Sequence, residues 1–332
     1  MSDLRRLRAW WSARRRFEFC LTVAMVITLT GFCGALVMLP NSALLPKPHA
    51  AQATADAVGQ APATDPRLAE VRRSIEPFGP IVARQVTTGD GQQSLVVGHP
   101  AQRIEIDVLE RELPAATTAV NDVWGTDWAQ ATTVVVASSP SEFAGLVHAG
   151  SMSAEVAAAS VADPLIPGTR PTGQRIVFSP DAGRRLDPEG LRTLLRHELT
   201  HIATRAETRD GAPLWMLEGF ADYTAHRGQG HRFADIAPTL TVQARLHELP
   251  GDLPADPDFT GRNAAGIYEQ AWSVCAYIAD KYDQSRLVEL YRQIAAARQT
   301  PATEDQILHT VLGTSRADFV ADWRNWLTTQ TV

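Results

Sequence analysis

The sequence contains very little cysteine and almost no lysine. Three cysteines in 332 residues cannot form the dense disulfide framework of a small secreted domain. Cys20 and Cys33 fall within one apolar run, and Cys275 stands alone in a predicted helix, where we expect a buried thiol. Lys47 and Lys281 are the sole lysines beside abundant arginine, a compositional bias that says little about function.

An excess of positive charge is also absent. The formal net charge is −6, and six arginines lie within residues 1–39. The rest of the chain therefore carries 25 basic and 35 acidic groups. Nucleic-acid binding requires a basic face, so we expect no nucleic-acid partner. The length suffices for one large or two small domains with a proper core.

One long apolar run stands out near the N-terminus. Residues 20–39, CLTVAMVITLTGFCGALVML, carry no charge, and twenty helical residues span roughly 30 Å, the thickness of a bilayer core. The arginines before the run and the interfacial Trp10 and Trp11 indicate a cytoplasmic N-terminus. We therefore expect a cytoplasmic Arg-rich tail over 1–16, a single transmembrane signal-anchor over 17–39, and the remainder of the chain outside the cytoplasm.

Other interpretations of this run stay open. A cleaved signal peptide would have a shorter apolar core, and a small-residue site such as Ala51-Gln52-Ala53 lies well after the run. The stretch Arg14-Arg15-Arg16-Phe17 partly resembles a twin-arginine signal, although Glu18 stands where an apolar residue is usual. A buried helix of a soluble protein is disfavoured because the run has no polar face.

The pattern becomes globular from about residue 67, after a linker over 40–66 that is rich in Ala, Pro, Thr and Gln and predicted to be disordered. We expect an α+β domain over 67–332, with a small mixed α/β lobe over 67–182 and a helical lobe over 183–332. Strands are predicted at 94–98, 103–107, 132–138, 159–162 and 175–178, although 103–107 could instead open a helix. Helices are predicted at 67–76, 109–124, 139–147, from 187 past 201, and at 213–227, 263–282, 285–297, 303–311 and 315–327.

The run HELTH, residues 197–201, is the most specific chemical signal. His197 and His201 are four residues apart, so a helix places both imidazoles on one face, where they can bind one metal ion. Glu198 lies next to the first ligand but does not face the ion directly. That is the position of a base acting on water that the ion activates. A match this short also arises by chance, so the surrounding residues decide whether it marks a metal site.

A third ligand is available on the next predicted helix. Catalytic zinc sites keep three protein ligands and one open position. Two antiparallel helices joined by a short loop can bring Glu218 against the histidine pair. Asp222, one helical turn later, is well placed to accept the second N–H of a zinc-bound histidine, His197, and so fix its tautomer. Without the histidine pair, Glu218 would be interpreted as a solvated charge on the helix surface. The apolar stretch LWMLEGFA around it disfavours that interpretation.

HELTH followed by WMLEGFADY resembles the gluzincin zinc metallopeptidases, the thermolysin-like and aminopeptidase-like clan. It is more closely similar to the peptidase MA-like domains of bacterial envelope proteins. The resemblance covers roughly residues 90–328, including VWGTDW (123–128) and YEQAWSVCAYIADKY (268–282). It implies a thermolysin-like zincin catalytic domain that binds Zn²⁺ and cleaves a peptide or protein substrate.

The resemblance implies one more catalytic residue and leaves one motif missing. In the aminopeptidase branch, a Tyr-Glu-Lys-Gly stretch supplies a tyrosine that stabilises the oxyanion, and the similar YEQA at 268–271 assigns this role to Tyr268. Because Gln270-Ala271 differs from the Lys-Gly of that stretch, Tyr268 could instead have only a packing role. No stretch like Gly-Ala-Met-Glu-Asn is present, so nothing indicates aminopeptidase specificity. The segment RIVFSP (175–180) is either a substrate-pairing edge strand or an ordinary sheet strand.

These patterns predict a membrane-anchored zinc metallopeptidase that acts outside the cytoplasm, at the cell membrane of a bacterial envelope, with Glu198 as general base. The alternative is a catalytically silent zincin-fold module for binding or scaffolding at that envelope. A third possibility is a zinc hydrolase acting on a non-peptide amide, such as a cell-wall link.

Overall fold

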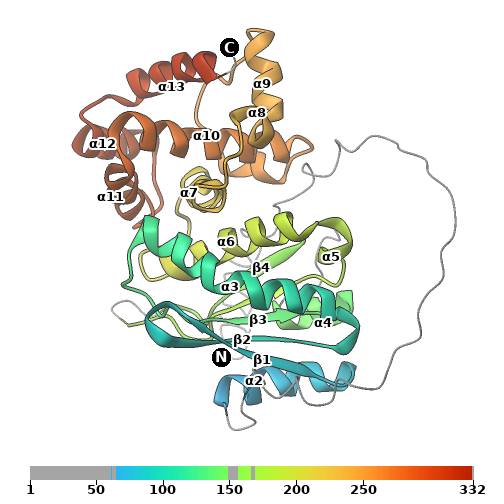
Figure 1. Cartoon of the computed structure of the whole chain (residues 1–332). Helices are drawn as coiled ribbons and strands as arrows, with labels where there is room; N and C mark the ends of the chain where they lie inside the picture. Colours follow the sequence, from blue (N-terminus) through green and yellow to red (C-terminus); the bar gives the residue numbers. More distant parts are fainter. Residues whose placement is uncertain (1–60, 62–64, 149–155, 166–168, 331–332) are drawn as a thin grey trace, which may run out of the picture.

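The computed structural model of the chain describes residues 61, 65–148, 156–165 and 169–330. The predicted cytoplasmic tail (1–16), the predicted transmembrane segment (17–39) and most of the predicted linker (40–66) lie outside these residues. None of the helices in the described ranges is long and apolar enough to cross a membrane. The described residues form a mixed sheet with helices on both faces and a further layer of helices beyond one of them (Figure 1).

Five strands form one mixed sheet. In chain order they are β1 (Val82–Thr88), β2 (Gln92–Gly98), β3 (Thr133–Val136), β4 (Ala158–Val161) and β5 (Arg175–Phe178). Their spatial order is β1-β2-β3-β5-β4, in which β2, β3 and β5 run parallel while β1 and β4 pair antiparallel at the two edges. The hypothesis that 175–180 is an edge strand is therefore wrong. The apolar run RIVF suits an interior strand that is buried on both faces.

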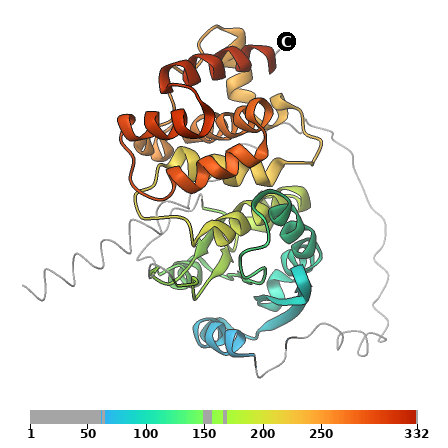
Figure 2. The ribbon, with the colours of Figure 1, turned by 90° about the vertical axis from the view of Figure 1, so that its left-hand side faces the viewer.

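Two hydrophobic cores lie on opposite faces of this sheet, because successive side chains of a strand alternate. Val96, Val134 and Ile176 face the larger core, which α3 (Arg103–Trp124) and α6 (Pro188–Thr204) cover. Val97 and Val135 face the smaller core. That core is covered by α2 (Pro66–Ile75) and α4 (Pro140–Leu146), as Figures 1 and 2 show.

The remaining helices complete the structure. They are α5 (Ala182–Arg185), α7 (Leu214–His226), α8 (Phe233–Ile236), α9 (Pro238–Arg245), α10 (Ala264–Tyr282), α11 (Gln284–Ile294), α12 (Pro301–Leu312) and α13 (Arg316–Gln330). Short 3-10 turns occur at Glu76–Phe78, Gly89–Gly91, Pro100–Gln102 and Asp256–Thr260. The larger core continues from the sheet into this helical layer, so the division at residue 182 into two lobes stays a prediction.

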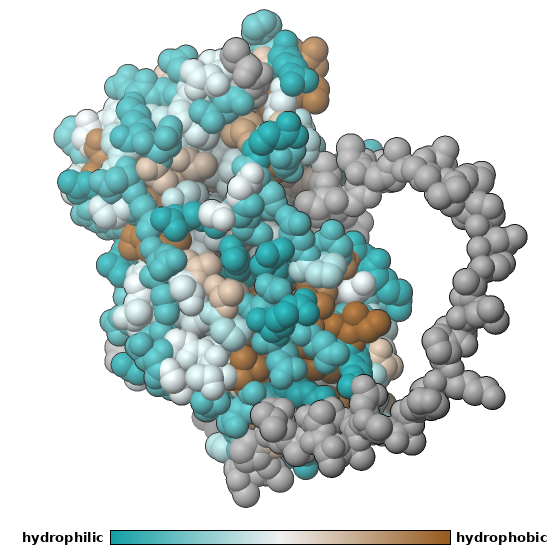
Figure 3. All heavy atoms as spheres, in the orientation of Figure 1, coloured by the Kyte–Doolittle hydropathy of each residue, from teal (hydrophilic) through white to brown (hydrophobic). Residues whose placement is uncertain are grey.

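Long-range hydrogen bonds tie the last two helices to the layer beneath them. The indole N–H of Trp215 on α7 donates to the Glu304 carboxylate on α12 over 2.8 Å. Arg316 on α13 donates to the other oxygen of Glu304 over 3.0 Å. The indole of Trp323 donates to the Ser273 hydroxyl on α10 over 3.1 Å and is fully buried. The face of the molecule seen in Figure 3 is mostly hydrophilic, with apolar residues in small groups.

Several local features differ from the sequence-based expectation, among them α8 and α9, which lie where no helix is predicted. Residues 103–107 open helix α3 and do not form a strand, as the alternative allowed. Strand β1 was not expected, since only its hairpin partner carries a strongly apolar run. The helix predicted at 303–311 begins at Pro301, and its N-cap is Thr300, whose hydroxyl accepts from the N–H of Thr303. Proline at the first helical position favours this earlier start.

Candidate metal centre

Helix α6 presents the two histidines because its start is well defined. The Asp187 carboxylate caps it by accepting from the N–H of Gly190 over 2.8 Å, and Pro188 occupies the first turn. This confirms the predicted helix start. Buried leucines then hold one face of α6 against the core, among them Leu194 and Leu195. That packing sets the rotation of the helix and so the direction in which the histidines point.

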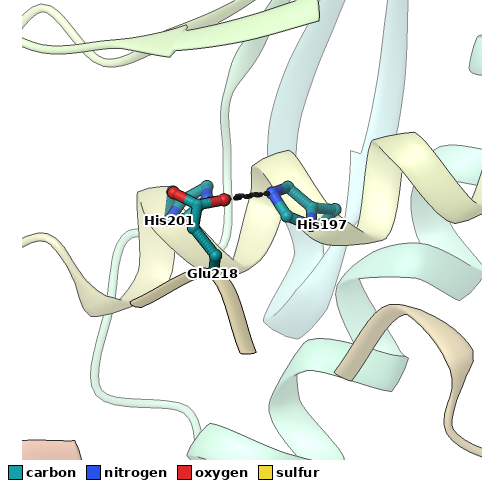
Figure 4. Close-up of side chains that lie close together, drawn as sticks. All are labelled: His197, His201 and Glu218. Carbon is teal, nitrogen blue, oxygen red and sulfur yellow. Dashed lines mark hydrogen bonds and ion pairs between the residues drawn. The ribbon is translucent and has the colours of Figure 1, made fainter. Parts of the chain in front are cut away.

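Helix α7 brings the third candidate ligand. Pro213 precedes its first residue, and the Asp256 carboxylate accepts from the N–H of Leu214 over 2.8 Å, which anchors the start of α7. After the loop 205–213, Glu218 lies against both histidines (Figure 4). Among the described residues, His197, His201 and Glu218 are the one group of His, Cys, Asp and Glu able to hold a metal ion.

The spacing of these three side chains suits a tetrahedral ion. The Nε2 atoms of His197 and His201 are 3.0 Å apart. The Oε2 atom of Glu218 is 3.3 Å from Nε2 of His197 and 3.7 Å from Nε2 of His201. A zinc ion with bonds of roughly 2.0–2.2 Å places its tetrahedral ligand atoms about 3.3 Å apart. The observed separations lie on both sides of that value.

Burial of the carboxylates also fits a cation. Glu198 and Glu218 are both 0% exposed, and neither accepts a hydrogen bond of normal geometry from the described residues. Buried carboxylates without such donors are strongly destabilising unless positive charge compensates them. Two neutral imidazoles and one carboxylate are a donor set that zinc prefers, so the residues present fit this ion.

The electrostatics of the cluster favour positive charge at its centre. Burial raises the pKa of Glu218, but attraction to His201 and His197 outweighs burial and lowers it to about 2. Burial lowers the pKa of His197, yet Asp222 and Glu218 outweigh it and raise this pKa well above 6.5. The same negative charges would stabilise a bound cation, which displaces protons from its ligands.

Glu198 lies in a different environment from Glu218. Burial raises its pKa, and the histidines His197 and His201 reduce this effect only in part. A buried carboxyl with a raised pKa is a suitable general base and acid near neutral pH. Ser160 on the edge strand β4 also lies close enough to Glu198 to lower its pKa slightly.

Asp222 contacts Nδ1 of His197, the ring nitrogen that faces away from the other candidate ligands. Its Oδ1 atom is 2.7 Å from Nδ1 of His197, which leaves Nε2 facing His201 and Glu218. This is the contact expected from the helical spacing of Glu218 and Asp222. A carboxylate at this place holds the imidazole in one tautomer and orientation.

Tyr268 on α10 faces the same group of charges. Its side chain is mostly buried and packs edge-on against Phe259 with ring centroids 5.1 Å apart. Burial raises its pKa well above 10, and the charges of Glu218, Asp222 and Glu198 raise it further. The phenol is therefore neutral and retains its proton. Its catalytic role stays a prediction.

Two features of the site carried no signal in the sequence. Gly219 lets α7 approach α10 closely, because a Cβ atom there would lie 2.3 Å from the backbone oxygen of Ala271. The other is the position of β4 beside α6, which depends on strand pairing across the whole sheet. Of the histidines without a predicted metal role, His226 and His231 are neighbours, with their Nδ1 atoms 3.4 Å apart.

Comparison with known proteins gives a distant likeness in fold. No family model and no curated protein matches this sequence. Among solved structures, the M1 zinc metallopeptidase from Deinococcus radiodurans is 18% identical with a TM-score of 0.45, over 76% of this chain and 53% of that one. A mutant of the Deinococcus enzyme bound to a Tyr-Ser-Ala substrate is 14% identical with a TM-score of 0.40, over 76% and 52%. This chain spans about half the length of those structures.

Proposed function

We propose that this protein is a zinc-dependent metallopeptidase in which His197, His201 and Glu218 hold the ion and Glu198 acts as the base. The observation that carries the proposal is the convergence of three candidate ligands beside a buried carboxylate that accepts no hydrogen bond of normal geometry from the described residues. Bound zinc would act as a Lewis acid and bring the pKa of water down to roughly 7.

The residues of the chain divide the remaining work. Glu198 accepts the proton of the attacking water and returns it to the leaving amine. Asp222 keeps Nδ1 of His197 occupied, so that Nε2 stays available. The neutral Tyr268 phenol donates a hydrogen bond to the developing oxyanion. The free edge of β4 offers backbone groups to an extended peptide, since this strand pairs only with β5 among the described strands.

A comparison of wild type with Glu198→Gln tests the proposal. We expect the purified full chain to contain about one zinc and to cleave peptides from a mixed library. Glu198→Gln should keep the zinc and lose hydrolysis, because the amide cannot accept the proton. Glu189→Gln, which changes an exposed carboxylate on the same helix, is the matched control and should leave both properties intact.

The alternative of a silent binding module predicts a different result. That module would bind zinc with the same stoichiometry and cleave no peptide in the library. Hydrolysis that survives Glu198→Gln would contradict the assigned base. The location outside the cytoplasm at a bacterial membrane is also a proposal, which rests on residues 1–39. Fractionation of cells that express the full chain, with and without those residues, tests it.

A further inference from the structure

A small cavity opens directly beside the candidate metal centre. Its volume is about 40 Å³, and it is partly open to solvent. One wall is the β4 edge and the residue after it, at Ser160, Val161 and Ala162. The opposite wall comes from α6 and α7, and His201 and Glu218 also line the cavity. Any group in it would therefore lie next to the site of bond cleavage.

The walls of this cavity are chemically suited to an apolar group. Several of the polar side chains that line it already bond to the backbone. Thr204 donates to the carbonyl of Thr200 over 2.9 Å, and Thr208 donates to the carbonyl of Thr204 over 3.0 Å. Gln174 donates to the carbonyl of Ile202 over 2.8 Å, and the Arg205 guanidinium, which also lines the cavity, donates to the carbonyl of Thr208 over 2.8 Å. The surface that remains for a ligand is largely aliphatic, including Ala162, Ile202 and Leu217.

The cavity volume sets the size of that group. An apolar cavity of roughly 150 Å³ binds benzene, so a cavity of about 40 Å³ is too small to enclose an aromatic ring. Small aliphatic side chains, such as those of alanine and valine, therefore suit it better than those of phenylalanine and tyrosine.

The sheet edge explains how a substrate side chain would reach the cavity. An extended peptide that pairs with β4 points its side chains alternately to opposite faces. Because Ser160 and Val161 belong both to this edge and to the cavity wall, one of those alternating side chains faces the cavity. We infer that the cavity receives the substrate side chain next to the cleaved bond and selects small aliphatic residues such as alanine and valine. This inference rests on the proposed peptidase function.

Binding to a non-cleaving variant tests the inference apart from catalysis. The probe is a series of end-blocked peptides, Gly-Gly-X-Gly-Gly, in which X is Gly, Ala, Val, Leu or Phe. Calorimetry with zinc-loaded, full-length Glu198→Gln should show the valine peptide binding about tenfold more tightly than the glycine peptide. The phenylalanine peptide should bind no better than glycine. Equal affinities, tightest binding of phenylalanine, or no binding at all would each overturn the inference.

Two cavity variants in the Glu198→Gln background sharpen the result. Leu217→Ala enlarges the cavity and should move the preference towards leucine and phenylalanine. Ala162→Leu fills it from the rim and should remove the advantage of valine while zinc stays bound. If Leu217→Ala unfolds, Ala162→Leu still decides the question. Hydrolysis by wild type is scored separately. Cleavage without a small-residue preference would overturn this inference alone, and preferential binding without cleavage would overturn the peptidase proposal alone.

Discussion

Replacing Gly219 with alanine should disrupt the candidate metal centre without changing any of its candidate ligands. Gly219 directly follows Glu218 on α7 and faces α10. An added Cβ would lie 2.3 Å from the carbonyl oxygen and 2.7 Å from the carbonyl carbon of Ala271, and 3.0 Å from Sγ of Cys275. Ordinary contacts between a carbon and a carbonyl oxygen are about 3.3–3.6 Å. The two helices must therefore separate locally by about 1 Å.

A displacement of that size is large for a metal ligand. Distances at a functional metal site hold to within about 0.2 Å, so moving Glu218 by about 1 Å removes it from effective coordination. Overpacking of this kind also costs roughly 1–3 kcal/mol of folding free energy. The higher helix propensity of alanine offsets this by about 1 kcal/mol at most. We expect Gly219→Ala to fold with a lower melting temperature and to bind zinc far more weakly than wild type.

Zinc titration calorimetry and thermal unfolding, run on the same samples, provide the measurement. Gly145→Ala is the matched control, because Gly145 lies within α4 and a Cβ atom there meets nothing within 4 Å. It should keep the zinc affinity of wild type. Cys275→Ala should not rescue Gly219→Ala, since the main obstruction is the backbone of Ala271. Wild-type zinc affinity in Gly219→Ala would refute the packing argument.

Three further predictions follow from the same geometry. Asp222→Asn should fold normally but lower zinc affinity roughly 10–100-fold, because the amide holds the His197 tautomer less well, and calorimetry measures this loss. If the Tyr268 phenol donates to the oxyanion, Tyr268→Phe should lower kcat roughly 10²–10³-fold with zinc content unchanged. An unchanged kcat would show that Tyr268 has only a packing role. Burial lowers the pKa of His226 to about 4 from 6.5, an effect that His231 increases and Asp222 opposes. Below pH 6.5 the His226 imidazole is therefore protonated in the unfolded chain but stays neutral in the folded chain until about pH 4. The unfolding free energy should consequently fall by up to about 3 kcal/mol between pH 6.5 and 4. Urea unfolding at both pH values should show a smaller loss in His226→Gln.

Local spacing was sufficient to predict which candidate metal ligands lie together. The four-residue separations of His197 and His201, and of Glu218 and Asp222, follow from the helical period alone. A short connection between two helices then restricts how those two faces can meet. The 2.7 Å contact between Asp222 and His197 agrees with that reasoning. The assignment of the ion as zinc stays a prediction from the donor set.

Features that depend on distant parts of the chain were not predictable in this way. The interior position of β5 depends on β4 pairing beside it, and no periodicity in residues 175–180 could reveal that partner. Strand β1 has partly polar residues on its exposed side and gains its conformation from pairing with β2. The need for glycine at 219 appears only once the backbone of Ala271 on α10 lies against it.

The hydrogen bond between Trp215 and Glu304 joins residues 89 positions apart and has a consequence for biosynthesis. During translation, both histidines and Glu218 leave the ribosome well before Glu304 is synthesised. Until then the Trp215 indole lacks its acceptor, and α7 lacks the support of α12 and α13. We therefore expect the three candidate ligands to hold their arrangement only once α12 has been synthesised and has packed against α7, so that a metal ion would be bound after that point in translation.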